Sequence, residues 1–167
     1  MTEVQILNER QIRQKVRRLA IEIYERNLDE SMIILAGINH NGIQFAHMLL
    51  EQLLKITDIP ITVTRIRLNP AHPLEDEAQV EMPLSEIEGK CIIVVDDVAN
   101  SGRTICYALK PLLRVLPKKI EVAVLVDRKH KSFPIRADYV GLSLATTLQE
   151  NIDVRIREVE QVSVYLN

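Results

Sequence analysis

The chain has 167 residues and a formal net charge of −2, with 47% hydrophobic and 26% charged residues. This length suits one domain with a substantial core, and the composition is that of an ordinary globular protein. The small negative charge gives no reason to expect a general attraction to nucleic acid or membranes. The polar first residues are unlike a signal peptide, and no apolar run approaches the roughly 20 residues of a membrane span, so we expect a cytoplasmic protein.

The predicted elements alternate between strands and helices along the chain. A helix is expected over 8–27, where Asn8 and Gln11 form a capping box before apolar residues at helical spacing. Further helices are predicted to begin near Gly42 and near Gly102. Apolar and β-branched runs predict the strands, at 31–37, 61–68, 91–95, 120–126, 137–144 and 162–166.

This order predicts an α/β fold, a single domain over 1–167 with a mostly parallel central sheet flanked by helices. The strand at 91–95 lacks alternation, as expected for a central strand buried on both faces. In such sheets, ligands bind at the carboxyl ends of the strands. The proline-rich and acidic stretch 69–89 reads as a long loop, and loops of this length are typical of functional lids.

Cys91 and Cys106 are the only cysteines, and both lie in apolar stretches. A disulfide framework or a zinc site needs more ligands than these two. We therefore expect two buried thiols.

The stretch "CIIVVDDVANSGRT" (91–104) places Asp96 and Asp97 at the carboxyl end of the central strand. A turn with one glycine follows and leads into a helix, whose first N–H groups and dipole favour an anion. The predicted phosphate-binding residues are Val98, Ala99, Asn100, Ser101, Gly102, Arg103 and Thr104.

A phosphate in direct contact with both carboxylates would be repelled, so the ligand needs a neutral spacer that carries hydroxyl groups. Ribose 5-phosphate has this form: its phosphate fits the turn while its 2- and 3-hydroxyls donate to Asp96 and Asp97. Carboxylates also stabilise positive charge at an anomeric carbon, so we predict this pair as catalytic. The alternatives are two solvated acids beside a helix cap, or the acid pocket of a phospho-accepting receiver domain. In receiver domains, however, the adjacent acids usually end the first strand, whereas here a long segment precedes them.

The motif resembles the phosphoribosyl-pyrophosphate (PRPP) motif of type I phosphoribosyltransferases. Three further segments resemble the PyrR family, pyrimidine operon attenuators that double as uracil phosphoribosyltransferases: 6–27, 34–53 and 122–141. Together these segments cover most of the chain, except the segment 66–89. The resemblance implies a Rossmann-like fold with a small hood and a mobile lid loop at about 69–89. It also implies a homo-oligomer, a dimer or a tetramer.

The resemblance further implies the reaction and the rest of the site. A nucleobase, with uracil favoured, would attack PRPP to make a nucleoside monophosphate, with Mg²⁺ held mainly by pyrophosphate and ribose oxygens and by no dedicated protein cage. Asp127 stands where hypoxanthine-guanine enzymes carry a lysine, which favours a pyrimidine. Lys131 would lie near the base-pocket entrance, and the backbone of 139–147 would read the base. The implied pyrophosphate loop is Asn39, His40, Asn41 and Gly42, and the implied base pocket is Asp127, Arg128, Tyr139 and Val140.

Three positions depart from the family's pattern. Asn41 replaces the arginine that usually precedes the second glycine of the pyrophosphate loop, and plain turn chemistry is the alternative reading of this loop. The tyrosine-arginine-acid-acid sequence of the lid is missing from 67–83. Only Arg65, Arg67 and His72 offer positive charge in this region. Asn100 stands where some relatives have an acid or a tyrosine, and an amide cannot act as a general base.

We predict an active nucleobase phosphoribosyltransferase and keep two alternatives. One is a non-catalytic sensor of PRPP or a nucleotide. The other is an RNA-binding regulator, although the negative net charge and the lack of an aromatic RNA-binding motif favour a solvated charged face. The basic residues that motivate it are Arg10, Arg13, Arg17, Arg18, Lys129, Lys131 and Arg136.

Overall fold

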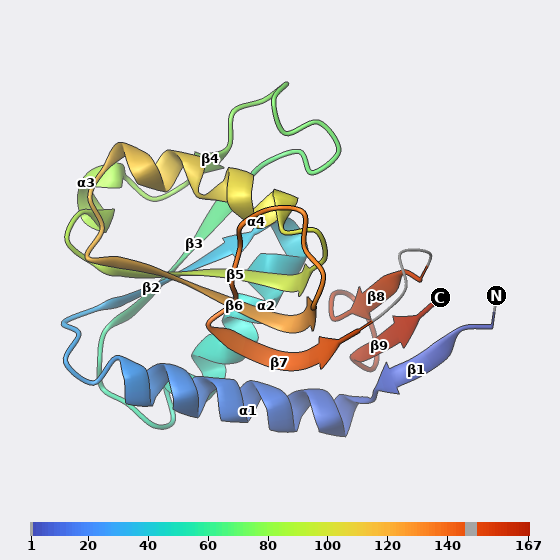
Figure 1. Ribbon diagram of the computed structural model, residues 1–167. Coiled ribbons are helices and arrows are strands. Elements are labelled where there is room, and N and C mark those ends of the chain that lie inside the picture. The colour runs from blue at the N-terminus through green and yellow to red at the C-terminus, as the bar shows by residue number, and fades with distance from the viewer. Residues whose placement is uncertain (1, 146–149) are drawn as a thin grey trace.

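A computed structural model describes residues 2–145 and 150–167 and contains one large and one small sheet (Figure 1). The strands of the large sheet are β2 Ile33–Ile38, β3 Ile61–Arg67, β4 Gln79–Val80, β5 Cys91–Ala99, β6 Lys119–Arg128 and β7 Tyr139–Leu144. They lie in the order β4-β3-β2-β5-β6-β7, and all neighbours are parallel except the short edge strand β4. The predicted α/β class with a mostly parallel central sheet is therefore confirmed.

Helices cover both faces of this sheet (Figure 1). The helices are α1 Glu9–Arg26 and α2 Asn39–Leu53 on one face, and α3 Leu84–Ile87, α4 Arg103–Ala108 and the 3-10 helix η1 Lys110–Arg114 on the other. β5 lies between both layers, and its residues Cys91–Val95 are fully buried, as predicted for a central strand. Among the described residues, no helix is long and apolar enough to cross a membrane.

A small antiparallel sheet corresponds to the hood that the family resemblance implied. It comprises β1 Val4–Leu7, β8 Ile152–Arg155 and β9 Ser163–Leu166, in the order β1-β9-β8. Strands from the two ends of the chain thus lie side by side (Figure 1). Neither β1 nor β8 was predicted, and each has only four residues.

The two long helices begin in different ways. The capping box of α1 is present: Asn8 Oδ1 accepts from Gln11 N at 3.0 Å, and Gln11 Oε1 accepts from Asn8 N at 2.9 Å. α2 begins at Asn39, so the start predicted near Gly42 is wrong. The Asn39 side chain bonds both backbone groups of Leu68 (2.9 and 3.1 Å), which fixes this helix start against the end of β3.

The stretch 69–89 is not the continuous loop that we predicted, because it contains β4 and α3. Glu81 N donates to Arg65 O at 2.9 Å, so this part of the stretch continues the edge of the sheet. The first part of the stretch, 69–78, which we call the lid segment, projects from the body of the molecule (Figure 1). It is held by Arg103, whose Nη2 donates to Pro70 O at 2.8 Å, and by an ion pair of Glu77.

Candidate functional site

Asp96 and Asp97 lie in the carboxyl half of β5, which is longer than predicted. Each carboxylate is fixed by the next backbone amide: Asp96 Oδ1 accepts from Asp97 N, and Asp97 Oδ1 accepts from Val98 N, both at 2.9 Å. Asp96 is 8% exposed, whereas Asp97 is half-buried. Burial, together with the charge of Asp97, raises the pKa of Asp96 well above its ordinary value. Asp96 is therefore the member of the pair that its environment drives toward the protonated form.

The first turn of α2 contacts this pair directly. Asn41 Nδ2 donates to Asp97 Oδ2 at 2.9 Å. The approach depends on Gly42, since a Cβ at this position would lie 2.6 Å from Val95 O, a separation that atoms essentially never adopt. A glycine at 42 thus lets the helix start lie against β5 and brings Asn41 within hydrogen-bonding distance of the carboxylate.

A cavity of about 380 Å³ brings together segments that are far apart in the sequence. The predicted residues that line it are Asn39, His40, Asn41, Asp96, Asp97, Val98, Asn100 and Thr104. Ile38, the last residue of β2, also lines it. Sequence reasoning missed three residues from other parts of the chain: Pro70 of the lid segment, and Ile152 and Arg157 of the hood. No motif marks these three residues, and only the packing of the hood and the lid segment over the strand ends brings them to the cavity.

The predicted phosphate-binding turn forms a small hollow between β5 and α4. Residues 98–105 line a space of about 50 Å³ there. Gly102 caps α4 with a φ of +83°, a conformation that favours glycine, and Ser101 Oγ accepts from Arg103 N at 3.3 Å. The Arg103 side chain reaches the lid segment, where its Nη2 donates to Pro70 O. The turn therefore offers backbone amides and hydroxyl groups next to the larger cavity.

Two of the predicted base-pocket residues lie at the carboxyl end of β6, where Asp127 pairs in register with Ala99 of β5. The Asp127 carboxylate lies 2.5 Å from Lys131 Nζ, and that amine also donates to Arg128 O at 2.9 Å. Arg128 Nη2 donates to Glu150 O at 2.7 Å. Asp127, Arg128 and Lys131 therefore lie at the same edge of the sheet as the aspartate pair.

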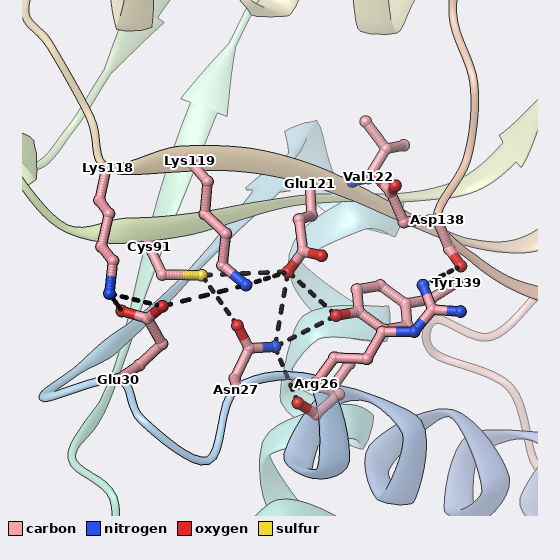
Figure 2. Close-up of polar contacts among 11 residues, drawn as sticks. Arg26, Asn27, Glu30, Cys91, Lys118, Lys119, Glu121, Val122, Asp138 and Tyr139 are labelled. Carbon is pink, nitrogen blue, oxygen red and sulfur yellow. Dashed lines mark hydrogen bonds and ion pairs between the residues drawn. The ribbon is translucent and has the colours of Figure 1, made fainter.

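Tyr139 and Val140 do not fit the base-pocket prediction. Tyr139 is fully buried, and its hydroxyl donates to Glu121 at 2.9 Å and accepts from Asn27 at 3.1 Å (Figure 2). These partners lie near the amino ends of the strands, away from the cavity. The carbonyl of Val140 accepts from Arg18 Nη2 at 2.7 Å, so it is already engaged. The predicted base-reading backbone extends to 147, and residues 146–149 lie outside the described part.

Comparison with known proteins identifies the family. The family model for the phosphoribosyl transferase domain matches residues 3–158. The chain belongs to the phosphoribosyltransferase family. It is 38% identical over 174 residues to the bifunctional protein PyrR of Bacillus velezensis, covering 97% of this chain and 96% of that protein. It is 40% identical over 149 residues to the bifunctional protein PyrR of Streptomyces coelicolor, covering 84% and 77%. The predicted likeness to PyrR is thereby confirmed.

Solved structures of other phosphoribosyltransferases share the fold. A hypoxanthine-guanine phosphoribosyltransferase of Bacillus anthracis superposes with a TM-score of 0.75 at 19% identity, covering 95% of each chain. The hypoxanthine phosphoribosyltransferase of Trypanosoma cruzi also gives 0.75, at 18% identity, covering 96% of this chain and 94% of that one. At these identities the likeness concerns the architecture alone.

Two of the arginines of this phosphoribosyltransferase that suggested RNA binding have partners within the chain. Arg18 donates to the carbonyls of Val140 and Gly141, and thereby ties α1 to β7. Arg13 pairs with Glu9 at 2.7 Å on the exposed side of α1. The predicted basic face is therefore partly used to hold the fold together.

The cysteines of this phosphoribosyltransferase differ in exposure. Cys91 is fully buried, and its Sγ donates to Asn27 Oδ1 at 3.3 Å (Figure 2). Burial is the largest of the causes that raise its pKa to about 12. Cys106 is only partly buried. The expectation of two buried thiols is confirmed for Cys91 and wrong for Cys106, which lies in the short helix α4.

Proposed function

We propose that this phosphoribosyltransferase transfers the phosphoribosyl group of PRPP to a nucleobase, with uracil favoured. The observation that carries the proposal is the cavity shared by the aspartate pair, the first turn of α2 and Thr104 in the first turn of α4. PRPP has a phosphate, a hydroxylated ring and a diphosphate in this order. The phosphate suits the amide-rich turn before α4, and the hydroxylated ring suits the two carboxylates. The diphosphate suits the start of α2.

The transfer breaks the bond between the anomeric carbon and the diphosphate oxygen and forms a bond from a base nitrogen to that carbon. The diphosphate leaves with the electron pair, and the proton of the base nitrogen passes to the leaving diphosphate or to solvent. Positive charge grows on the sugar ring in between, and Asp97, held by Asn41 and Val98 N, is positioned to stabilise it. The remaining contribution of the protein is to hold the two reactants in line.

Mg²⁺ fits this site as a metal held mainly by ligand oxygens. Within the described residues, no three His, Cys, Asp or Glu side chains converge as a metal site. Asp96 and Asp97 are the carboxylates that line the cavity, and Mg²⁺ commonly takes one or two carboxylates beside substrate phosphates. When bound, the metal would neutralise charge on the leaving diphosphate.

The end of β6 supports a pyrimidine as the acceptor. Hypoxanthine-guanine enzymes carry a lysine at the position of Asp127, whereas here a carboxylate occupies it and is paired with Lys131 at 2.5 Å. A carboxylate accepts hydrogen bonds and cannot donate one to a purine carbonyl. The donor that would contact a 6-oxopurine carbonyl is therefore missing from this position, which favours a pyrimidine such as uracil.

The direct test is an assay with PRPP, Mg²⁺ and a panel of uracil, hypoxanthine, guanine and adenine, with nucleotide products separated by chromatography. We expect uridine monophosphate as the main product and no product from a D96N/D97N double variant. Binding of PRPP in calorimetry without product from any base would favour the non-catalytic sensor instead. Sedimentation of the same preparation tests the proposed homo-oligomer, a dimer or tetramer.

A role as an RNA-binding regulator is a second candidate, favoured by a groove of about 650 Å³ along the start of α1. Arg10, Arg13 and Arg17 line it. Binding to the leader of the chain's own transcript should weaken with rising salt, and the triple glutamine variant should reduce it. Equal binding by the triple variant would contradict this role for the groove.

A further inference from the structure

A second cavity, of about 650 Å³, lies beside the first. It is enclosed by the start of α2, the carboxyl end of β3 and the lid segment, and it shares Asn39 and His40 with the cavity of the aspartate pair. Arg65 and Arg67 of β3 both line it. A ligand group that extends past the first turn of α2 would therefore reach two cationic side chains.

The side chain of Arg65 differs from that of Arg67 in having no hydrogen-bond or ion-pair partner among the residues that the structure describes. It is level with Gly37 on the adjacent strand β2, which leads directly into α2. Its Nε is buried and has no hydrogen-bond partner among the residues that the structure describes. Arg67, in contrast, donates from its Nε to Glu81 Oε1 at 2.7 Å. An unpaired, partly desolvated guanidinium is costly to maintain, and a bound anion would remove this cost.

The acids that line this cavity do not cancel the charge of Arg65. Glu77 is already neutralised, since its carboxylate accepts from Arg114 Nη2 at 2.9 Å and lies 3.9 Å from Lys110 Nζ. Asp76 also lines the cavity and is exposed to solvent, which screens its charge. Arg65 therefore remains available to an anion.

We propose that Arg65 binds the diphosphate of PRPP and the product pyrophosphate. This role rests on the proposed function and makes it more specific. Asn41, which stands where relatives carry an arginine, donates to Asp97 and brings no charge to the diphosphate. Arg65 approaches the same helix start from β3, and its planar fork suits two phosphate oxygens.

Calorimetry with three ligands tests the role of Arg65. The ligands are PRPP, inorganic pyrophosphate and ribose 5-phosphate, at one fixed Mg²⁺ concentration. R65Q should weaken the first two by about 10- to 100-fold, the usual range for a lost charge-assisted contact. Ribose 5-phosphate lacks the diphosphate, so R65Q should bind it as the unmodified protein does. R65K keeps the positive charge but lacks the planar guanidinium. Its affinities for PRPP and pyrophosphate should lie between those of R65Q and those of the unmodified protein.

K55Q is the matched control, because it removes one positive charge from the exposed turn after α2 and should leave all three affinities unchanged. Unaltered pyrophosphate binding by R65Q would overturn the role of Arg65, and so would an equal loss for ribose 5-phosphate. If R65Q does not fold, R65K is used instead. Unaltered pyrophosphate binding by R65K, or an equal loss for ribose 5-phosphate, would then overturn the role of Arg65. If the unmodified protein binds none of the three ligands, the proposed function fails as well, which separates the two outcomes.

Discussion

Asn41, in the first turn of α2, donates a hydrogen bond to Asp97, near the end of β5, across 2.9 Å. The two residues are 56 positions apart in the chain. Since Val98 N occupies the other oxygen of Asp97, this contact completes the fixation of the carboxylate. The residue expected to contact pyrophosphate therefore positions the acid expected to face the ribose.

Replacing Asn41 should affect catalysis through Asp97. We expect N41A to lower kcat/KM for PRPP by about 10-fold, because a carboxylate that loses one charge-assisted contact is less well oriented. N41D should be worse at pH 8, where two carboxylates would face each other, and should recover as the pH falls and one takes a proton. Steady-state kinetics between pH 5 and 8 measure both effects. A flat profile for N41D relative to the unmodified enzyme would show that Asn41 does not act on Asp97.

The burial of Asp96 predicts a stability change of unusual sign. Its pKa is raised in the folded state, so the folded protein holds this proton above pH 3.8, where the unfolded chain loses it. Stability should therefore fall as the pH rises from about that value through the raised pKa. D96N removes this loss and should be more stable than the unmodified protein at pH 8, with the difference vanishing near pH 3.

Urea denaturation of D96N and of the unmodified protein at pH 8 and at pH 3 measures this difference in the free energy of unfolding. D97N should recover only part of the stability, because burial is the largest cause of the shift and the charge of Asp97 is the second. At each pH, the free energy of unfolding of the unmodified protein is subtracted from that of D96N. A difference that is smaller at pH 8 than at pH 3 would refute this account of the pair.

The network around Tyr139 should support stability and leave catalysis unaffected. Y139F removes the hydroxyl that joins Glu121 and Asn27, and we expect a loss of about 1–3 kcal/mol in the free energy of unfolding. The KM for the base should stay unchanged, because this hydroxyl points away from the cavity. Y107F is the control, since its edge contact with Phe133 needs only the ring. If Y139F has a raised KM for the base and an unchanged free energy of unfolding, Tyr139 belongs to the base pocket after all.

The thiols should react at very different rates. Cys91 is fully buried with a pKa of about 12, so at pH 8 almost none of it is the reactive thiolate. We expect the C106S variant, which retains only Cys91, to resist a thiol reagent until urea unfolds it. C91S should react without denaturant through the partly exposed Cys106. Rapid labelling of folded C106S would contradict the buried position of Cys91.

The parts of the site that could be predicted are those contained in one short stretch. The order of strand, two acids, turn and helix at 91–104 is local, so the sequence alone predicts Asp96, Asp97 and the turn at Gly102. The contact of Asn41 with Asp97 and the position of Arg157 depend on packing between distant segments, which no spacing reveals. Tyr139 was misplaced for a related reason: the pattern predicts a strand but not which end of it faces the site.

Some helix and strand boundaries could not be predicted for the same reason, because they depend on contacts with distant segments. The start of α2 depends on the bonds of Asn39 to Leu68, which lies in a different element. The edge strand β4 has two residues and exists only because β3 is there to pair with it. Such elements are determined by their neighbours and carry little signal of their own.

The order of strands in the hood has a consequence for biosynthesis. β9 lies between β1 and β8, yet it follows both of them in the chain. During translation the hood cannot assemble until Ser163–Leu166 has left the ribosome, although the large sheet can already have formed. Ile152 and Arg157 therefore reach the cavity of the aspartate pair late. A nascent chain should complete the hood side of this cavity only after its core has formed.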